Sequence, residues 1–387
     1  MTSSGVAWKY RYTYIAGGVN NANNWLTWQD PALPPGQYAL DYMNNTAAAG
    51  YIPAFTYYEL LQSDPSTGVD ESDRDYNNLN NASTMSAYYG NYVVLMQKAH
   101  QFGGQVIVHV EPDLWAYLEQ RAGRGGSPAS VSAMVQGSGF ADVRGIPDTA
   151  AGFADALLKL RDQYAPNVVL ATHASLWASG YDIGTNNDAS LNVSGEADLT
   201  GSFLNAAGLA SNPYGSTFDL VFNDVADHDA GWYGDNSHWW DRTNATLPNF
   251  SRWLTWMAEL RAQTRKPLVV WQVPVGNQYF RTMDNTNGHY QDNRAEYFLA
   301  HPAELQAAGI QTVLFGAGNA GQTTYTDAVR DGITNPAPVN SFQCAGCNNH
   351  VSSYGDDDGG YLRIFVGRYL ATPIRQSRLP AVSCRCH

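Results

Sequence analysis

The length, composition and charge of the chain already limit its partners. The chain has 387 residues, 44% of them hydrophobic, which is enough for a large buried core. It carries 22 Lys and Arg residues against 35 Asp and Glu residues, a formal net charge of -13, which argues against binding to nucleic acid or to an anionic membrane surface. No apolar run approaches the roughly 20 residues that a membrane span needs. We therefore expect an uncharged partner and a monomeric chain.

Seven short apolar segments predict the strands of the fold. They span residues 10–16, 51–57, 105–110, 167–172, 218–222, 268–273 and 311–315. Several are almost continuously apolar, as strands buried on both faces of a parallel sheet should be. Segments with helical periodicity separate them, at residues 86–100, 149–163, 250–262 and 293–308. This alternation predicts an α/β fold, namely a TIM-like (β/α) barrel of seven or eight strands.

We expect this barrel to form a single domain over residues 1–370. An eighth strand could lie between residues 16 and 51, or at 361–366, where the sequence could equally form a helix. A doubly wound open sheet is the alternative architecture. However, Gly17-Gly18 after the first predicted strand lacks the G-x-G-x-x-G spacing of a nucleotide-binding turn. We therefore favour the barrel and expect no cofactor.

The two ends of the chain carry little periodicity. Residues 371–387 are expected to form a poorly ordered tail or an appended extension. The four cysteines, Cys344, Cys347, Cys384 and Cys386, could bind zinc or form disulfides, and a local Cys344–Cys347 bridge is the simpler expectation. Residues 1–5 do not resemble a signal peptide, so we expect a secreted protein whose signal has been removed.

Acidic residues follow two of the predicted strands. In a (β/α) barrel the strand ends meet at one face, where active sites are built. Hydrolysis of a glycosidic bond needs two carboxyl groups, one to protonate the leaving oxygen and one to attack or to activate water. Glu111, at the end of an apolar strand, is the first choice for the general acid, because desolvation raises the pKa of a carboxyl. A salt bridge with a barrel Arg is its structural alternative.

The second carboxylate is expected after the fifth strand, where three aspartates lie within six residues. Asp224 and Asp227 are equal candidates, and one of the three, with Asp229 included, is expected to cap the following helix. Asp113 could also serve as a catalytic carboxylate, or could orient Glu111. The sequence therefore predicts two carboxyl groups but leaves the choice of the aspartate open.

Aromatic and polar side chains at the same strand ends are the candidate sugar contacts. Flat rings stack on the apolar faces of sugars, and polar groups bond their hydroxyls. A single Trp is more often a core residue, so we expect only about half of these tryptophans to meet substrate. The candidates are Glu59, His109, Trp115, His173, Trp177, Asp229, Trp232, Trp271, Gln272, Asn277 and His289.

One motif resembles a known family. Val110-Glu111-Pro112-Asp113 resembles the Glu-Pro-Asp strand end of the family 6 cellulases, which have a distorted seven-stranded barrel. It is also distantly similar to the Glu-Pro that follows a strand in the large retaining clan of cellulases. The chain lacks the Asp-rich strand end that carries the family 6 proton donor, and His109-Val110 replaces the Asn of the retaining clan. The resemblance therefore implies a divergent family of (β/α)-barrel glycoside hydrolases.

These features predict a glycoside hydrolase that cleaves a polysaccharide such as a β-linked glucan. Two other functions use the same residues. A non-catalytic carbohydrate-binding barrel would share the aromatic residues, and a metal-dependent hydrolase or deacetylase could use Asp224, Asp227 and His228. The sequence contains neither H-x-H after its first strand nor H-E-x-x-H, so we expect no metal. The linkage and the stereochemical outcome stay open.

Overall fold

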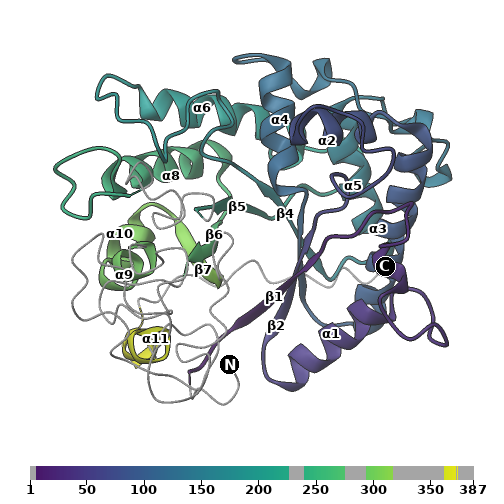
Figure 1. Cartoon of the computed structure of the whole chain (residues 1–387), viewed down its shortest axis with the longest axis horizontal. Coiled ribbons are helices and arrows are strands. Elements are labelled where there is room, and N and C mark those ends of the chain that lie inside the picture. The colour runs from purple at the N-terminus through teal and green to yellow at the C-terminus, as the bar shows by residue number, and fades with distance from the viewer. Residues whose placement is uncertain (1–5, 226–238, 275–292, 317–360, 372, 374–387) are drawn as a thin grey trace.

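Seven parallel strands form the centre of the fold. The computed structural model of the chain describes residues 6–225, 239–274, 293–316, 361–371 and 373. The strands follow one another in the sheet in the order of the sequence, and together they make a nearly closed barrel with β1 and β7 as its two edges (Figure 1). They are β1 (Tyr10–Ile15), β2 (Ile52–Tyr57), β3 (Val106–Val110), β4 (Val168–His173), β5 (Leu220–Asp224), β6 (Leu268–Pro274) and β7 (Ile310–Gly316).

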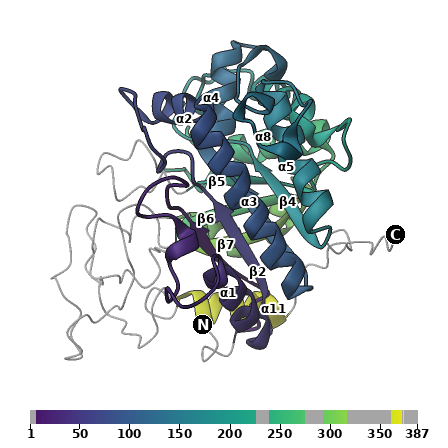
Figure 2. The same cartoon turned by 90° about the vertical axis from the view of Figure 1, so that its right-hand side faces the viewer.

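Helices surround the strands on the outside, so the architecture is the predicted α/β barrel. α1, α3 and α5 lie beside β1 to β4, and α8, α9 and α10 lie beside β5 to β7 (Figures 1 and 2). The helices are α1 (Gln37–Ala48), α2 (Glu71–Leu79), α3 (Ala82–Phe102), α4 (Pro112–Ala122), α5 (Ala150–Tyr164), α6 (Val193–Leu204), α8 (Phe250–Thr264), α9 (Arg294–Ala300), α10 (Pro302–Ala307) and α11 (Tyr361–Ala371). Short single turns occur at Trp25–Thr27, Pro128–Ser130, Gln136–Ser138, Ala141–Val143 and Asn205–Leu209.

Capping side chains fix where the long outer helices begin. Asn81 accepts a hydrogen bond from the Thr84 amide at the start of α3, at 3.1 Å. Thr149 does the same for Gly152 in α5, at 3.0 Å, and Asn249 for Arg252 in α8, at 2.9 Å. Each cap satisfies a backbone N–H that has no partner inside the helix. The helices therefore start at defined points beside the strand ends.

The core has two layers, which follow from the alternation of each strand. In β3 the side chains of Val106, Val108 and Val110 belong to the layer between the strands and the outer helices, whereas Ile107 packs inside the barrel. Three tyrosines of β1 line the interior beside Trp271 of β6. These residues are Tyr10, Tyr12 and Tyr14. The interior is therefore filled by side chains and is not a channel.

The structure resolves the question of the eighth strand within the described residues. The segment at 361–371 forms helix α11, with Leu362 and Val366 buried, as the helical alternative predicts. Between β1 and β2 the chain forms the turn at Trp25–Thr27 and helix α1 and no strand. The single helix predicted at 293–308 is divided into α9 and α10, because Pro302 lacks the N–H that would continue the first helix.

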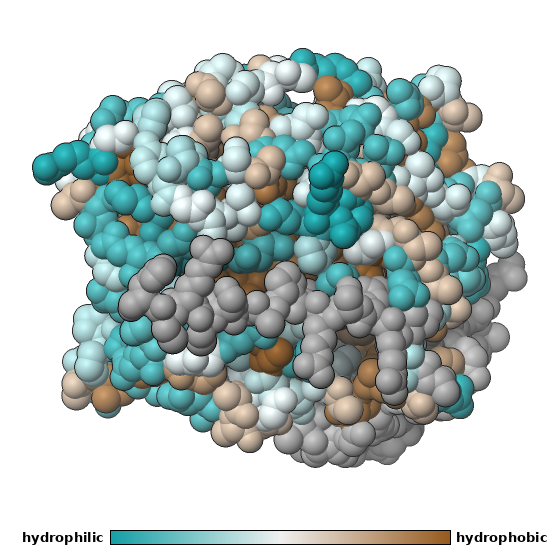
Figure 3. Space-filling view, turned by 180° about the vertical axis from the view of Figure 1, so that it is seen from behind, coloured by the Kyte–Doolittle hydropathy of each residue, from teal (hydrophilic) through white to brown (hydrophobic). Residues whose placement is uncertain are grey.

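The described surface carries few large apolar side chains. Those exposed are Leu33, Val69, Tyr181 and Tyr214. Figure 3 shows brown side chains scattered among teal and white ones on one face. Within the described part of the chain, no helix combines the length and the apolar composition that crossing a membrane requires.

Candidate active site

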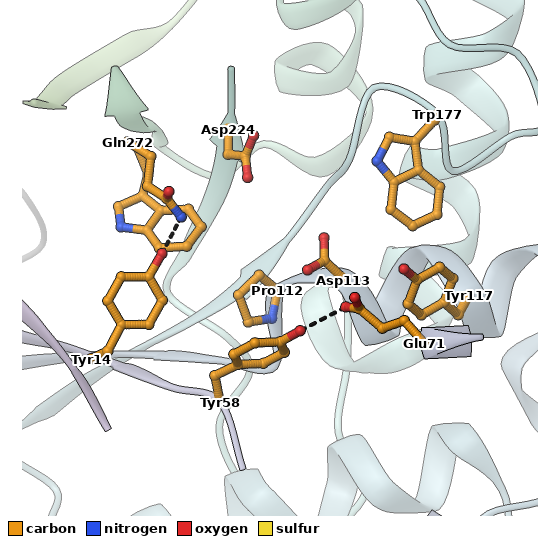
Figure 4. A pocket seen from close by; sticks show the side chains of 10 residues that line it. Tyr14, Tyr58, Glu71, Pro112, Asp113, Tyr117, Trp177, Asp224 and Gln272 are labelled. Carbon is orange, nitrogen blue, oxygen red and sulfur yellow. Dashed lines mark hydrogen bonds between the residues drawn. The ribbon is translucent and has the colours of Figure 1, made fainter. Parts of the chain in front are cut away.

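A pocket of about 420 Å³ opens at the carboxyl ends of the strands. This is the face where the loops that follow the strands of a (β/α) barrel build active sites, and the volume falls within the range of small-molecule sites. Figure 4 shows its walls, which come from β1, β5, β6, α2, α4 and the loops after β2 and β4. The lining residues are Tyr14, Tyr58, Glu71, Pro112, Asp113, Tyr117, Trp177, Asp224, Trp271 and Gln272.

Two aspartates from different strand ends face this pocket. Asp224 is the last residue of β5, and Asp113 lies in the first turn of α4, just after β3. In Figure 4 both carboxyl groups point into the space between β5 and α4. Asn223 turns the other way, since its side chain donates to the Ala174 carbonyl at 2.8 Å and accepts from the Trp253 indole at 3.1 Å. The alternation of β5 therefore directs Asp224 toward the pocket.

The turn between β3 and α4 delivers Asp113. Glu111 ends the strand with a φ of +43°, a left-handed conformation that is unusual for a residue other than glycine. Pro112 follows at the first position of the helix, which suits its fixed φ and its missing N–H. Asp113 then lies in the first helical turn, where the helix dipole favours a negative charge. The chain direction changes abruptly here, and Pro112 and Asp113 line the pocket.

Aromatic rings form two walls of the pocket. Tyr117 and Trp177 have ring centroids 5.0 Å apart with their planes inclined at 41°. Tyr14, which lies on the other side of the pocket in Figure 4, makes a similar contact with Trp271 at 5.5 Å and 48°. Trp271 is almost fully buried, whereas Trp177 is half-buried. Rings of this kind can stack on the apolar face of a sugar.

A third carboxyl group, that of Glu71, also lines the pocket. The Tyr58 hydroxyl donates a hydrogen bond to Glu71 Oε1 at 2.6 Å (Figure 4). Burial raises the pKa of Tyr58 well above its ordinary value, and the negative charges of Asp113 and Glu71 raise it further. Tyr58 is therefore a neutral hydrogen-bond donor at any physiological pH, and it holds Glu71 in place.

Gln272 reaches into the pocket from a strained position. Its φ is +54°, and the ladder between β6 and β7 is shifted between Val270 and Val273, which indicates a β-bulge. The Gln272 amide donates to the Tyr14 hydroxyl, joining β6 to β1 across the mouth of the barrel. Bulges commonly redirect a side chain next to an active site, and here the redirected side chain lines the pocket.

The two predicted histidines lie beneath the pocket, inside the barrel. His109 Nε2 and His173 Nδ1 are 3.0 Å apart, and the His109 ring stacks on Phe222 at 4.3 Å. Burial lowers the pKa of both rings, that of His173 to about 3. The pKa of His109 is lowered mainly by burial and in addition by the neighbouring His173. Both are therefore neutral, and they support the Trp271 ring, which they contact edge to face. They do not line the pocket, so the structure does not bring them into contact with a substrate there.

Glu111, the first choice for the general acid, lies outside the pocket. Its side chain is 0% exposed, and its Oε1 accepts from the Glu59 amide at 3.0 Å. Glu59 is equally buried and accepts from the Gly17 amide at 3.2 Å. Asp75 of α2 is a third buried carboxyl beside them. Glu111 and Asp224 therefore do not share the pocket, because Asp224 lines it whereas the carboxyl group of Glu111 is buried on the Glu59 amide. The left-handed backbone at Glu111 breaks the alternation of β3 at this point.

Other predicted residues lie in the core or outside the described ranges. Trp115 is 1% exposed, packs against Phe153 and Phe218, and donates its indole N–H to the Val110 carbonyl at 2.9 Å. It is a core residue and is not part of the pocket. The predictions for Asp227, Asp229, Trp232, Asn277, His289 and the four cysteines concern residues that the structure does not describe. Among the described residues, no three His, Cys, Asp or Glu side chains are grouped as a metal site would require.

Five pocket residues had no place among the predicted site residues, namely Tyr14, Tyr58, Glu71, Pro112 and Tyr117. For Tyr14 and Tyr117 the spacing in the sequence could have indicated their place in the site. Tyr14 shares the period of two with Tyr10 and Tyr12, and Tyr117 stands one helical turn after Asp113. Tyr58 directly follows a predicted strand. Glu71 comes from a helix thirteen residues further along the chain than its partner Tyr58, and no local pattern connects the two.

No family model and no curated protein matches the chain. Among solved structures, cellobiohydrolase II (Cel6A) from Humicola insolens, in complex with glucose and cellotetraose, is similar at 16% identity and a TM-score of 0.36. That match covers 66% of this chain and 63% of the other. GH26A from a Muricauda species matches at 10% identity and a TM-score of 0.37, over 81% of this chain and 76% of that one.

A third structure, an HPPK-DHPS in complex with substrates, matches at 12% identity and a TM-score of 0.26, over 80% of this chain and 47% of the other. The first two structures are glycoside hydrolases and the third carries a different name. At these identities and TM-scores the three matches carry no argument about the substrate or the mechanism of this chain.

Proposed function

We propose that the chain is a glycoside hydrolase that cleaves a polysaccharide, such as a β-linked glucan, with Asp113 and Asp224 as its two catalytic carboxyl groups. One observation carries the proposal. Two carboxyl groups from different strand ends meet in one aromatic-lined pocket at the carboxyl face of a barrel. Glycosidases need such a pair, one group to protonate the leaving oxygen and the other to attack the anomeric carbon or to activate water.

The rest of the pocket suits a sugar ring. Trp177 and Tyr117 offer aromatic surface on one side, and the Gln272 amide and the Tyr14 hydroxyl offer hydrogen bonds on the other. A site that combines flat rings with a few directed polar groups matches the apolar faces and the hydroxyl groups of a sugar. The lining that the structure describes contains three acids and no Lys, Arg or His, which favours a neutral substrate over an anionic one.

A polysaccharide screen tests the proposal. The purified protein should release reducing ends from at least one β-glucan or related glycan, with and without EDTA. The Asp113→Asn, Asp224→Asn double variant, purified in the same way, controls for a contaminating hydrolase and should release none. Glycan binding without cleavage by the wild type would identify a carbohydrate-binding barrel. Activity abolished by EDTA and restored by a divalent metal would identify a metal-dependent hydrolase.

A further inference from the structure

Two buried glutamates connect the loops that follow the first three strands. Glu111, at the end of β3, accepts from the Glu59 amide in the loop after β2, at 3.0 Å. Glu59 in turn accepts from the Gly17 amide in the loop after β1, at 3.2 Å. The Glu111 amide donates to the Tyr57 carbonyl at 2.8 Å, so β2 and β3 are joined in both directions. Glu111 thus binds the backbone of the loop after β2, and Glu59 binds the backbone of the loop after β1.

Further hydrogen bonds hold the same loops. Ser63 donates to the Glu59 carbonyl at 2.8 Å and accepts from the Val19 amide at 3.0 Å. Asn78 of α2 donates to the carbonyls of Leu60 and Ser63, at 2.7 and 2.8 Å. The loop after β2 therefore has fixed partners on the loop after β1 and on α2. Tyr58 of this loop lines the pocket, directly beside Glu59.

The backbone at Glu111 is held in a costly conformation. A left-handed backbone is unfavourable for residues other than glycine, and it persists only where the surroundings require it. Glycine would adopt this φ without strain, yet the chain carries a glutamate whose side chain is completely buried. The strain and the burial together indicate that the side chain itself has a role.

Resting on the proposed function, we infer that Glu111 is a positioning residue, whose carboxyl group, through the Glu59 amide, fixes the loop that carries Tyr58 against the turn that carries Asp113. It contacts no substrate, because it lies behind the pocket wall. This positioning role requires that the side chain of residue 111 offers a hydrogen-bond acceptor at Oε1 and fits its buried site closely. It does not require a negative charge.

The surroundings of Glu111 agree with a neutral side chain. Burial raises its pKa to about 8, although the Glu59 amide and the Tyr88 hydroxyl lower it in part. The titratable groups around it are Glu59 and Tyr57 of the β2 end, Tyr88 of α3 and Asp75 of α2. Their negative forms would oppose a charge on Glu111, and the pKa of Asp75 is itself raised to about 9 by burial and by Glu111. A neutral acid has nearly the shape of an amide, so glutamine can replace it.

Three variants separate positioning from catalysis. Glu111→Gln keeps the acceptor, Glu111→Gly keeps the left-handed backbone but removes the carboxyl, and Glu119→Gln changes another buried carboxyl that lies away from the pocket. We expect Glu111→Gln and Glu119→Gln to stay within about threefold of the wild-type kcat, and Glu111→Gly to lose roughly tenfold or more. A Glu111→Gln variant as inactive as Asp113→Asn would overturn the inference, because the charge would then be needed. A fully active Glu111→Gly variant would overturn it too, because the side chain would then position nothing.

Amide hydrogen exchange separates this test from the proposed function. The amide of Glu59 should exchange as slowly in Glu111→Gln as in the wild type, and much faster in Glu111→Gly, whether or not the protein cleaves any glycan. Equal protection in all three proteins would contradict the positioning role while leaving the proposed hydrolase intact. If the wild type cleaves nothing but the exchange pattern holds, the proposed function fails and the connection between the loops stands.

Discussion

Two sets of carboxyl groups lie at the same end of this barrel, and they differ in access. Asp113 and Asp224 line the pocket, whereas Glu59, Asp75 and Glu111 are completely buried behind its wall. The members of the second set have raised pKa values because burial disfavours their charged forms. The same face of the barrel therefore carries both kinds of carboxyl group, and only Asp113 and Asp224 of these five line the pocket.

The backbone at residue 111 creates the difference between neighbouring acids. Ile107 packs inside the barrel and the side chain of His109 lies there too, so a regular continuation of β3 would direct residue 111 to the barrel mouth. The left-handed turn at Glu111 breaks this alternation. It sends the Glu111 carboxyl to the Glu59 amide and leaves Asp113, two residues later, in the pocket.

The largest expected effect is on kcat, and it distinguishes the carboxyl groups of the pocket from the buried ones. Asp113→Asn and Asp224→Asn should each lower kcat by roughly 10²–10⁴-fold, because each removes a group that, in the proposed function, transfers a proton or attacks in the reaction. Rates measured on the best glycan of the screen check this. Glu111→Gln is the matched control, since it makes the same chemical change behind the wall. A loss of kcat in Glu111→Gln as large as in Asp113→Asn and Asp224→Asn would contradict the distinction between pocket and buried carboxyl groups.

The second effect concerns stability and pH. Burial raises the pKa of Glu111 from 4.5 to about 8 in the folded state. The stability that it contributes is therefore complete below about pH 4.5 and is lost as the pH rises through 8. Relative to Glu111→Gln, the wild type should lose up to about 1.4 kcal/mol of unfolding free energy per pH unit in this window. Urea unfolding of both proteins at pH 5 and pH 8 measures this loss. If the free energies of unfolding of the two proteins change equally between these pH values, the pKa of Glu111 is not raised in the folded state.

A third effect tests the aromatic wall. Trp177→Ala should weaken oligosaccharide binding by roughly 3- to 10-fold, because it removes one ring of the contact with Tyr117 and the surface on which a sugar can stack. Trp177→Phe keeps a smaller ring and should lose less. Calorimetric titration of the Asp224→Asn background, in which cleavage is blocked, gives the affinities. Unchanged binding in Trp177→Ala would move the substrate away from this wall.

The smallest effect concerns the far side of the pocket. Tyr14→Phe removes the hydroxyl that accepts from Gln272, and so leaves the side chain of Gln272, whose backbone is strained, without one of its contacts. We expect a rise in KM of about two- to fivefold with little change in kcat, as for the loss of one neutral hydrogen bond. Steady-state kinetics check it. A large fall in kcat would instead place Tyr14 at the reacting atoms.

The sequence predicted the strands better than the site. Short apolar runs bounded by turns identify buried parallel strands directly, and all seven lie where they were predicted. Asp113, Asp224, Trp177, Trp271 and Gln272 were predicted as site residues and line the pocket. That active sites form where the strands of a (β/α) barrel end predicts which residues lie near the site. It does not predict the direction of a side chain after a left-handed turn.

Glu111 and Trp115 show this limit. Both follow the same strand, and both lie in the interior, Glu111 through its backbone conformation and Trp115 through its place on the inner face of α4. Glu71 shows another limit, because it reaches the pocket from a separate helix. Contacts between segments distant along the chain leave no local pattern to read.

The most direct test of the central claim is a crystal structure of the Asp224→Asn variant with an oligosaccharide of the glycan that the wild type cleaves. We expect sugar rings between Trp177 and Trp271, with the bond to be cleaved lying between residue 224 and the Asp113 carboxyl. An oligosaccharide bound elsewhere on the barrel, with this pocket empty, would contradict it.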